Sequence, residues 1–345
     1  MIPIQNIYYM LSYAFQVLNE QGYKNIATEQ FNNTGELMAA ILEKGIAIQI
    51  KRGLGKEYIL QTEALSSLQG KIDIAESIKT QSMLRKQLIC TYDEFSVNSI
   101  MNRIIKSTVE LLLRSNISKQ RKKNLRKLMV YFSEVDFIDL YTVNWNVQYN
   151  RNNQTYRMLI SICYLVVKGL LQTQSNGHTK LMDFLDEQRM CRLYEKFILE
   201  YYRREFKNQI TANASQIPWQ LDNEENSMLP VMQSDIMLQS GEKVLIIDAK
   251  YYEHSTQVQF DKHTLHSGNL YQIFTYVKNK EYELREKNHT VSGMLLYAKT
   301  DEEIYPNNVY QMSGNQITVR TLGLNLPFDE IAGQLNTIAK THFDL

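Results

Sequence analysis

The chain has 345 residues, 44% of them hydrophobic, and its 38 Lys and Arg nearly cancel its 37 Asp and Glu to leave a formal net charge of +1. This length predicts about two domains, and the apolar content with the low net charge excludes an intrinsically disordered chain. The charge balance also excludes a protein that coats nucleic acid or acidic lipid through a broad positive surface.

The sequence predicts a cytoplasmic protein with no membrane partner. The start, Met1-Ile2-Pro3-Ile4, lacks the basic region of a signal peptide. The longest apolar stretch, 158–171, contains Ser161 and Lys168 and is shorter than the roughly 18–20 residues of a bilayer span, so it predicts a buried helix. The cysteines are Cys90, Cys163 and Cys191. Their wide spacing without a CxxC pair argues against a disulfide framework or a zinc cluster.

The N-terminal half is predicted to combine helices with a β-hairpin. Ile7, Met10, Leu11 and Ala14 recur at helical spacing. The predicted elements are a helix over 5–19, a helix over 34–49, short strands over 46–52 and 56–61 around a turn at 53–55, a loop over 62–70 and a helix over 97–114 with Ser96 as N-cap.

A dense basic run covers 119–127. Such a run most often forms the solvated face of a helix, here with Leu125 and Leu128 turned inward. Contact with DNA phosphate, or with an acidic patch on a partner protein, is the alternative that the sequence leaves open.

The second half changes character after the polar, Asn- and Arg-rich stretch 149–157, which predicts a loop near a domain boundary. We therefore expect one domain over 1–150 and another over 151–345. The later predicted elements are helices over 156–172 and 185–207, strands over 229–238 and 243–250 around a turn at Ser240-Gly241, a helix over 267–280 and a strand over 291–298. This order predicts an α+β or α/β domain around a central mixed sheet.

The strand 243–250 carries the most informative residues. Side chains alternate along a strand, so Asp248 and Lys250 share one face while Ile247 and Ala249 share the other. A buried apolar strand that ends with a carboxylate beside an ammonium breaks the local hydrophobic pattern. Such violations tend to mark functional sites.

A second carboxylate is expected close by. Asp235 lies on the preceding strand, and a hairpin with its turn near 240–241 brings it to the end of the Asp248 strand. Two carboxylates suit a hard divalent cation such as Mg²⁺ better than zinc. A metal held there polarises a phosphoryl oxygen, while Lys250 could orient or activate the attacking water. The alternative is a solvated Asp–Lys pair at a strand end.

This arrangement resembles the PD-(D/E)XK nuclease superfamily with a QxxxY helix. The resemblance assigns Asp235, Asp248 and Lys250 to the metal and the water, and Gln272 and Tyr276, at i and i+4 on one helix face, to support of the site. It also calls for a helix glutamate that completes the metal ligands. Glu195 is the best match, and Glu200, on a different helix face, is the competitor.

Further segments extend the likeness over residues 2 to about 340. Those segments are Ile4–Ala14, Gly70-Lys71-Ile72-Asp73, Asn102–Thr108, Asp248–Tyr252 and His266–Gln272. They resemble the McrC family, the nuclease subunit of the McrBC 5-methylcytosine-specific restriction system. The resemblance implies a nuclease half that cuts both strands of DNA with modified cytosine, and an N-terminal half that docks on an McrB-like AAA+ GTPase hexamer and stimulates it.

The chain carries no GxxxxGK[ST] phosphate loop, because Gly53-Leu54-Gly55-Lys56 is too short. GTP is therefore expected on the partner, and a turn at Lys51-Arg52-Gly53 could reach the partner's nucleotide. Cutting both strands requires a second copy of the complex. The main alternative is a non-catalytic adaptor or GTPase activator that retains a nuclease fold, and a weaker one is a nuclease without a motor. The modified base, the stoichiometry and the number of metals stay open.

Overall fold

The computed structural model describes residues 2–19, 23, 26, 29–151, 153–175, 187–222, 228–252, 257–259, 262–299 and 305–345. The chain forms two compact units. The inserted unit is Thr28–Asp183, and the terminal unit combines Met1–Ala27 with Phe184–Leu345. This division differs from the boundary expected at residue 150, because residues 151–183 belong to the inserted unit and the first residues belong with the C-terminal part of the chain.

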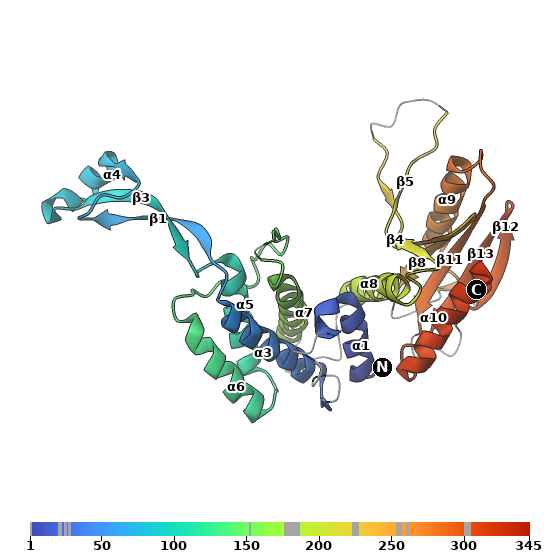
Figure 1. The fold of residues 1–345 in the computed structure, drawn as a ribbon, viewed down its shortest axis with the longest axis horizontal. Helices are drawn as coiled ribbons and strands as arrows, with labels where there is room; N and C mark the ends of the chain where they lie inside the picture. The colour runs from blue at the N-terminus through green and yellow to red at the C-terminus, as the bar shows by residue number, and fades with distance from the viewer. Residues whose placement is uncertain are drawn as a thin grey trace. The chain divides into compact units, whose positions relative to one another are not determined.

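The inserted unit combines helices with a small sheet. Its elements are α3 (Thr34–Arg52), β1 (Glu57–Leu65), β2 (Lys71–Asp73), α4 (Ile74–Lys79), the 3₁₀ helix η3 (Ser82–Arg85), β3 (Leu88–Ser96), α5 (Ile100–Arg114), α6 (Lys119–Met129), the 3₁₀ helix η4 (Val130–Phe132) and α7 (Tyr156–Ser175) (Figure 1). Helix α3 packs on α6 and α7, and α5 packs on α7. Fully buried side chains such as Leu37, Ile104 and Leu112 form the core among these helices.

The predicted strand over 46–52 is wrong. Those residues continue α3, with Ile46 and Gln49 both buried at the i, i+3 spacing of one helix face. The alternation of Ile46, Ile48 and Ile50 imitates a strand, but the helix continues to Gly53, where φ is +92° and the N–H donates to the Ile50 carbonyl. Residues 51 and 52 therefore form the last turn of a helix rather than the tip of a hairpin.

The hairpin of this unit is longer than expected. Strand β1 extends to Leu65, within the predicted loop 62–70, and pairs antiparallel with β3, whose other edge carries β2. Gly70 precedes β2 with φ +66°, and a Cβ there would lie 2.3 Å from the Thr91 carbonyl oxygen. Only glycine fits this approach.

Helix α5 begins three residues later than expected. Ser99, not Ser96, is its N-cap, and its side chain accepts a hydrogen bond from the Asn102 N–H. The buried Asn102 amide donates to the carbonyls of Gly55 and Val97 and accepts from the Tyr156 hydroxyl at 2.8 Å. This one side chain joins α5, the segment before β1, and the start of α7.

The terminal unit is built on a six-stranded sheet. Its elements are α1 (Ile4–Ala14), the 3₁₀ helix η1 (Gln16–Asn19), α8 (Glu187–Glu205), β4 (Thr211–Asn213), β5 (Gln216–Ile217), β6 (Met232–Gln233), β7 (Ile236–Ser240), β8 (Lys243–Lys250), β9 (Gln257–Gln259), β10 (Lys262–Thr264), α9 (Ser267–Glu283), β11 (Thr290–Ala298), β12 (Asn308–Met312), β13 (Asn315–Leu322) and α10 (Phe328–Phe343). The strand order is β12-β13-β11-β8-β7-β4, in which β8, β11 and β13 run parallel and the other pairings are antiparallel. The expected central mixed sheet is confirmed.

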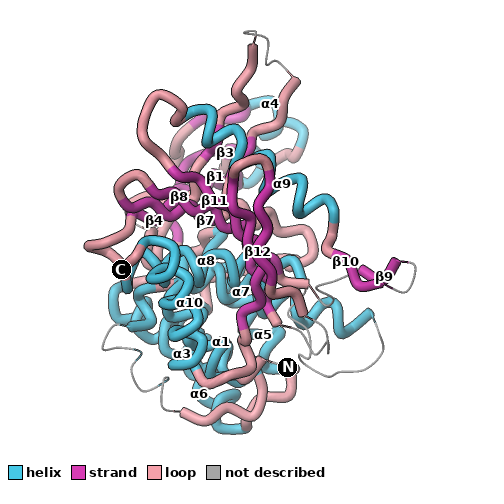
Figure 2. Tube along the Cα trace, turned by 90° about the vertical axis from the view of Figure 1, so that its right-hand side faces the viewer, coloured by secondary structure: helices cyan, strands magenta, loops and turns pink. Residues whose placement is uncertain are grey.

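Helices cover both faces of this sheet. On one face, Ile273 and Val277 of α9 pack against Val244 and Ile246 of β8. Leu245 and Ile247 point the other way and are also fully buried. Helix α8 contacts β8, β7 and β4, and α10 contacts β13. Figure 2 shows the strands of the sheet in magenta with these helices beside them.

The N-terminal helix α1 packs into the terminal unit. The buried Asn6 amide donates to the carbonyls of Leu324 and Leu326, just before α10. The ring of Tyr9 stacks on Phe328 with centroids 4.5 Å apart, and Tyr13 packs against Tyr201 of α8. These contacts explain why the first residues separate from the inserted unit. Among the described helices, none is long and apolar enough to cross a membrane.

Candidate active site

The site forms at the C-terminal end of β8, in the middle of the sheet. This strand is buried from Val244 to Ala249. Asp248 and Lys250 lie on the same strand face as Val244 and Ile246, which α9 covers. The Asp248 side chain is 1% exposed and the Lys250 side chain 14% exposed. A carboxylate so deep in an apolar layer requires a compensating partner.

Asp235 reaches this place through the β7–β8 hairpin. The turn at Gly241, with φ +56°, sets the register in which Ile236 faces Ile247. One step further along the same register, Asp235 stands opposite Asp248. Its Oδ2 accepts a hydrogen bond from the Ala249 N–H at 3.0 Å. The sequence-predicted meeting of Asp235 with the end of this strand is therefore observed.

Lys250 connects the carboxylates to α9. Its Nζ lies 2.9 Å from Asp248 Oδ2 and donates to Gln272 Oε1 at 3.3 Å. Gln272 Nε2 in turn donates to the hydroxyl of the buried Tyr276 at 2.9 Å. The structure thus brings Gln272 and Tyr276 into one chain of contacts with Lys250 and Asp248.

Helix α8 contributes Glu195 rather than Glu200 to this neighbourhood. Glu195 accepts a hydrogen bond from the Cys191 thiol at 3.0 Å, and the same sulfur lies 3.9 Å from the Ala249 carbonyl oxygen. Glu200 instead pairs with Arg203 at 2.8 Å. The Cys191–Glu195 spacing of i, i+4 on a predicted helix was the available signal for this contact.

The electrostatics of these groups follow from burial. Burial raises the pKa of Asp248 to about 7. The Lys250 ammonium acts to lower this pKa, and the Asp235 carboxylate raises it further. Burial alone lowers the pKa of Lys250, but the adjoining Asp248 outweighs it and raises the net value. Burial also raises the pKa of Glu195, with Asp235 adding to it, and raises the pKa of Cys191 to about 12. Lys250 therefore stays protonated at neutral pH.

Two observations bear on a metal ion. Both oxygens of Asp248 are buried and accept no hydrogen bond, although Lys250 lies beside Oδ2 as an ion pair. This donor set suits Mg²⁺, which binds through one or two carboxylates and keeps several waters. Among the described residues, no three His, Cys, Asp or Glu side chains already stand in position around a metal. Glu195 accepts its hydrogen bond from Cys191 and does not form such a group with the two aspartates.

A buried polar cluster next to the site was not anticipated from the sequence. The Asn269 amide accepts from the Tyr252 hydroxyl at 3.4 Å and donates to the Tyr297 hydroxyl at 3.0 Å. Tyr297 is the strand partner of Lys250 on β11. The alternation that places Asp248 and Lys250 on one strand face, continued two residues further, would have placed Tyr252 on that face as well; this signal in the sequence was missed.

Comparisons with known proteins point to one family. A sequence model described as "McrBC 5-methylcytosine restriction system component" matches residues 5–298. The chain is 30% identical over 330 residues to the "Type IV methyl-directed restriction enzyme EcoKMcrBC" of Escherichia coli (strain K12), covering 94% of this chain and 93% of that protein.

Two solved structures are also similar. A half-complex from a tetradecameric assembly of Thermococcus gammatolerans McrB AAA+ hexamers with bound McrC matches 97% of this chain and 76% of the matched chain, with a TM-score of 0.48 and 18% identity. A second structure, the McrBC complex of the same organism, matches 59% of each chain with a TM-score of 0.42 and 22% identity.

Proposed function

This chain belongs to the family of McrBC 5-methylcytosine restriction system components, and from that premise we propose that it is the Mg²⁺-dependent DNA endonuclease subunit of a GTP-dependent restriction complex. The observation that carries the proposal is the buried Asp248 at the end of β8, with Asp235 and Lys250 beside it. A hairpin that brings Asp235, just before β7, to Asp248 and the protonated Lys250 on β8 supports the nuclease class PD-(D/E)XK, whose motif the sequence resembles.

Each residue has a definite chemical task in this proposal. Asp235 and Asp248 would hold Mg²⁺, with Glu195 as the further carboxylate on the neighbouring helix. Held there, the ion would supply positive charge to polarise the scissile phosphoryl oxygen and to stabilise the leaving oxygen. Lys250, kept protonated by Asp248, donates a hydrogen bond that orients the attacking water and offsets phosphate charge. This protonation favours an orienting role over that of a general base.

Gln272 and Tyr276 hold Lys250 in place. The Gln272 carbonyl oxygen accepts from Lys250, and its amide nitrogen donates to the Tyr276 hydroxyl. Since Tyr276 is buried against the sheet, this pair fixes the direction of a long, flexible lysine side chain. They are positioning residues in the proposal.

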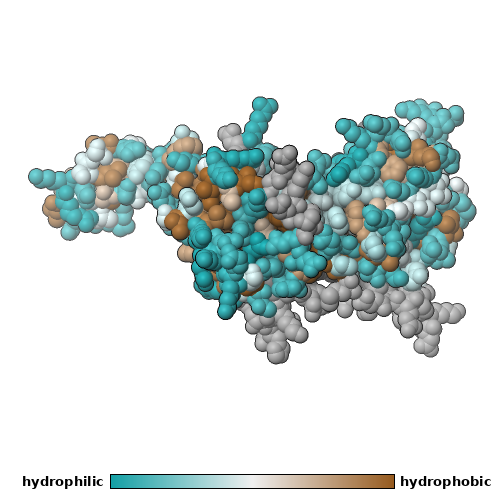
Figure 3. Space-filling view, turned by 60° about the horizontal axis from the view of Figure 1, so that its bottom comes forward, coloured by the Kyte–Doolittle hydropathy of each residue, from teal (hydrophilic) through white to brown (hydrophobic). Residues whose placement is uncertain are grey.

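A protein partner is the second half of the proposal. We place an McrB-like AAA+ GTPase hexamer on the inserted unit. GTP is expected on this partner, because the sequence of this chain has no phosphate loop of its own. The support is a set of large apolar side chains exposed on the β1–β3 hairpin, α4 and η3: Tyr58, Leu60, Ile74, Ile78, Leu84 and Phe95, each at least 55% exposed. Figure 3 shows hydrophobic residues on the surface at its left-hand end, where Figure 1 places β1, β3 and α4. Exposed apolar patches mark protein interaction sites.

DNA is the substrate in this proposal. Recognition of modified cytosine is assigned to the complex rather than to this chain, in line with the name of the family. The described part of the chain offers one such site, so cutting both strands needs a second copy of the complex. The partner delivers the DNA, which is compatible with a net charge of only +1.

The test is cleavage of methylated duplex DNA by the chain together with its motor, GTP and Mg²⁺. Asp235→Ala and Lys250→Ala are expected to abolish cutting while complex formation persists. Glu200→Gln is the matched control, because this carboxylate lies on the same helix as Glu195 but pairs with Arg203. Cutting at the unaltered rate by Asp235→Ala overturns the assignment and leaves the non-catalytic adaptor.

A further inference from the structure

Helix α6 carries several positively charged side chains and no negatively charged one. The segment from Lys119 to Met129 contains no Asp or Glu. Its exposed cations are Lys119, Lys123, Arg126 and Lys127. On other helices several exposed cations pair with a carboxylate three or four residues away, as in Lys79–Glu76, Arg114–Glu110 and Arg203–Glu200. Among the described residues, the four exposed cations of α6 have no such partner.

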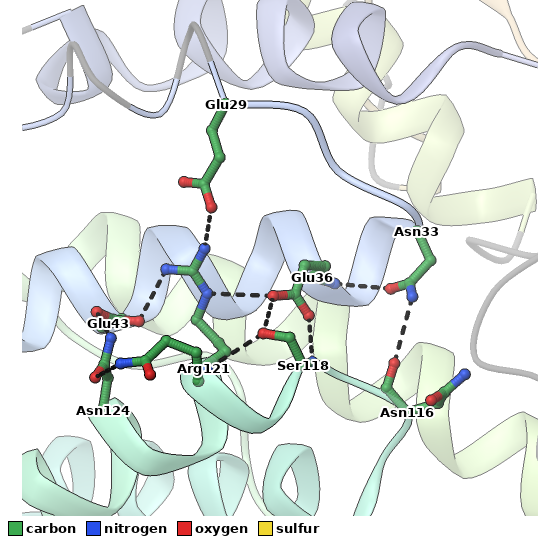
Figure 4. A network of polar contacts seen from close by, with 9 residues as sticks. Glu29, Asn33, Glu36, Glu43, Asn116, Ser118, Arg121 and Asn124 are labelled. Carbon is green, nitrogen blue, oxygen red and sulfur yellow. Dashed lines mark hydrogen bonds and ion pairs between the residues drawn. The ribbon is translucent and has the colours of Figure 1, made fainter.

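The remaining arginine of the run explains how this charged face is held. Arg121 is 13% exposed and turns inward, where it meets Glu29, Glu36 and Glu43. Figure 4 shows the guanidinium surrounded by these carboxylates, with Asn124 also donating to Glu43. The network ties α6 to α3 and leaves the opposite side of α6 facing solvent as a fixed surface.

The charge of the whole inserted unit points the same way. Residues 28–183 contain 21 Lys and Arg against 14 Asp and Glu, a net charge of +7. The rest of the chain therefore carries −6, which together give the +1 of the complete sequence. A neutral total conceals one basic and one acidic unit, and a basic unit attracts a polyanion.

The composition of the α6 face distinguishes a phosphate backbone from a protein surface. Protein interfaces are enriched in aromatic residues and depleted of lysine, and the inserted unit already shows such an apolar surface on β1, α4 and η3. The α6 face has three lysines and one arginine with no aromatic residue between residues 119 and 129, and the nearest exposed aromatic side chain, Tyr131, follows on η4. Lysines on a helix are typical contacts to DNA phosphates. Figure 1 shows α6 and α4 at separate ends of this unit.

We propose that the exposed face of α6, formed by Lys119, Lys123, Arg126 and Lys127, binds the phosphate backbone of double-stranded DNA. It contacts the duplex without reading its sequence, outside the carboxylate site of the terminal unit. This inference rests on the proposed function only in that DNA is the substrate. It adds to the chain a grip on the duplex that does not depend on the motor.

The test compares two variants of the full chain that lose the same charge. One carries Lys119→Gln, Lys123→Gln, Arg126→Gln and Lys127→Gln. The matched control carries Lys71→Gln, Lys79→Gln, Arg85→Gln and Lys86→Gln, four exposed cations near α4 in the same unit. Binding of a fluorescent unmethylated duplex is measured by anisotropy over a range of salt concentrations. Both variants keep Arg121 and Leu125, and circular dichroism verifies their folding.

The α6 variant is expected to bind the duplex more weakly and with a shallower salt dependence. Removing one phosphate–cation pair lowers the slope of log K against log salt by about 0.9 and weakens binding about eightfold at 0.1 M salt. The variant removes four cations, so contact of only two of them with phosphate already means about 60-fold weaker binding, while the control keeps the slope of the unaltered chain. Equal weakening in both variants shows a bulk charge effect and overturns the proposal.

Other outcomes also decide against it. If the unaltered chain binds no duplex, the α6 face does not bind DNA and the proposal fails. If the α6 variant binds duplex normally but loses its complex with the AAA+ protein, the face binds an acidic protein surface instead. Failure of the nuclease proposal is recognised separately. The α6 variant is expected to retain the capacity to cut when duplex and complex are supplied at saturating concentration, whereas an Asp235→Ala chain is expected to bind duplex and not cut it.

Discussion

Replacing Arg121 by methionine tests whether the carboxylate network of Figure 4 holds α6 on α3. The substitution keeps most of the apolar stem but removes the charge shared by three glutamates. Glu36 and Glu43 would then remain 13% and 22% exposed without a counter-charge. Removing one partner of a buried ion pair costs about 3–5 kcal/mol. Because water reaches part of each carboxylate here, we expect about 2–3 kcal/mol.

Hydrogen exchange of the α6 amides is the assay, since the chain has two units and one unfolding transition cannot be assumed. A loss of 2 kcal/mol corresponds to about 30-fold faster exchange through local opening. Arg126→Met, at an exposed position of the same helix, is the control and should change exchange by less than about threefold. Unchanged exchange in Arg121→Met would refute the view that this network anchors the helix. Glu43→Gln in the Arg121→Met background should recover part of the loss.

Three further predictions concern the site. Glu195→Gln should lower the cleavage rate, while Glu200→Gln should not, and the reverse order in a cleavage assay would reassign the helix carboxylate. Tyr276→Phe removes the acceptor of the Gln272 amide, so cutting should slow about tenfold with duplex binding unchanged; a weaker affinity at full rate would contradict a positioning role. Because burial raises the pKa of Asp248 to about 7, protons compete with Mg²⁺ below that pH. Calorimetry at pH 6 should show about tenfold weaker Mg²⁺ binding than at pH 8, and a pH-independent affinity would count against this ligand.

The sequence predicted the terminal unit well where local pattern and burial agree. The apolar run 243–250 forms β8 with the expected bounds, and the helix and strand after it are observed. The predicted strand 229–238 instead divides into β6 and β7, which lie in different sheets. Asp235 was found because a hairpin of known turn position fixes the register of its two strands. The i, i+4 spacing of Gln272 and Tyr276 likewise fixed their common helix face.

The errors arose where distant contacts decide. Residues 46–52 alternate like a strand, yet the helix continues because its buried face packs in the core of the inserted unit. The union of α1 with the C-terminal half depends on Asn6 and on rings that meet Phe328, more than 300 residues away. The Arg121 network joins carboxylates 78–92 positions earlier in the chain. No local pattern reports such pairings.

The nuclease itself is tested most directly by measuring two activities of one variant. Asp248→Asn preserves the size of a side chain that is 1% exposed, removes its charge and replaces one acceptor oxygen by an amide donor. In a complex with the AAA+ protein, GTP and Mg²⁺ on methylated duplex DNA, this variant should lose double-strand cutting while GTP hydrolysis is stimulated as by the unaltered chain. Cutting that persists at the unaltered rate would contradict the account, because the strand end of β8 would then not be where the phosphodiester bond is broken.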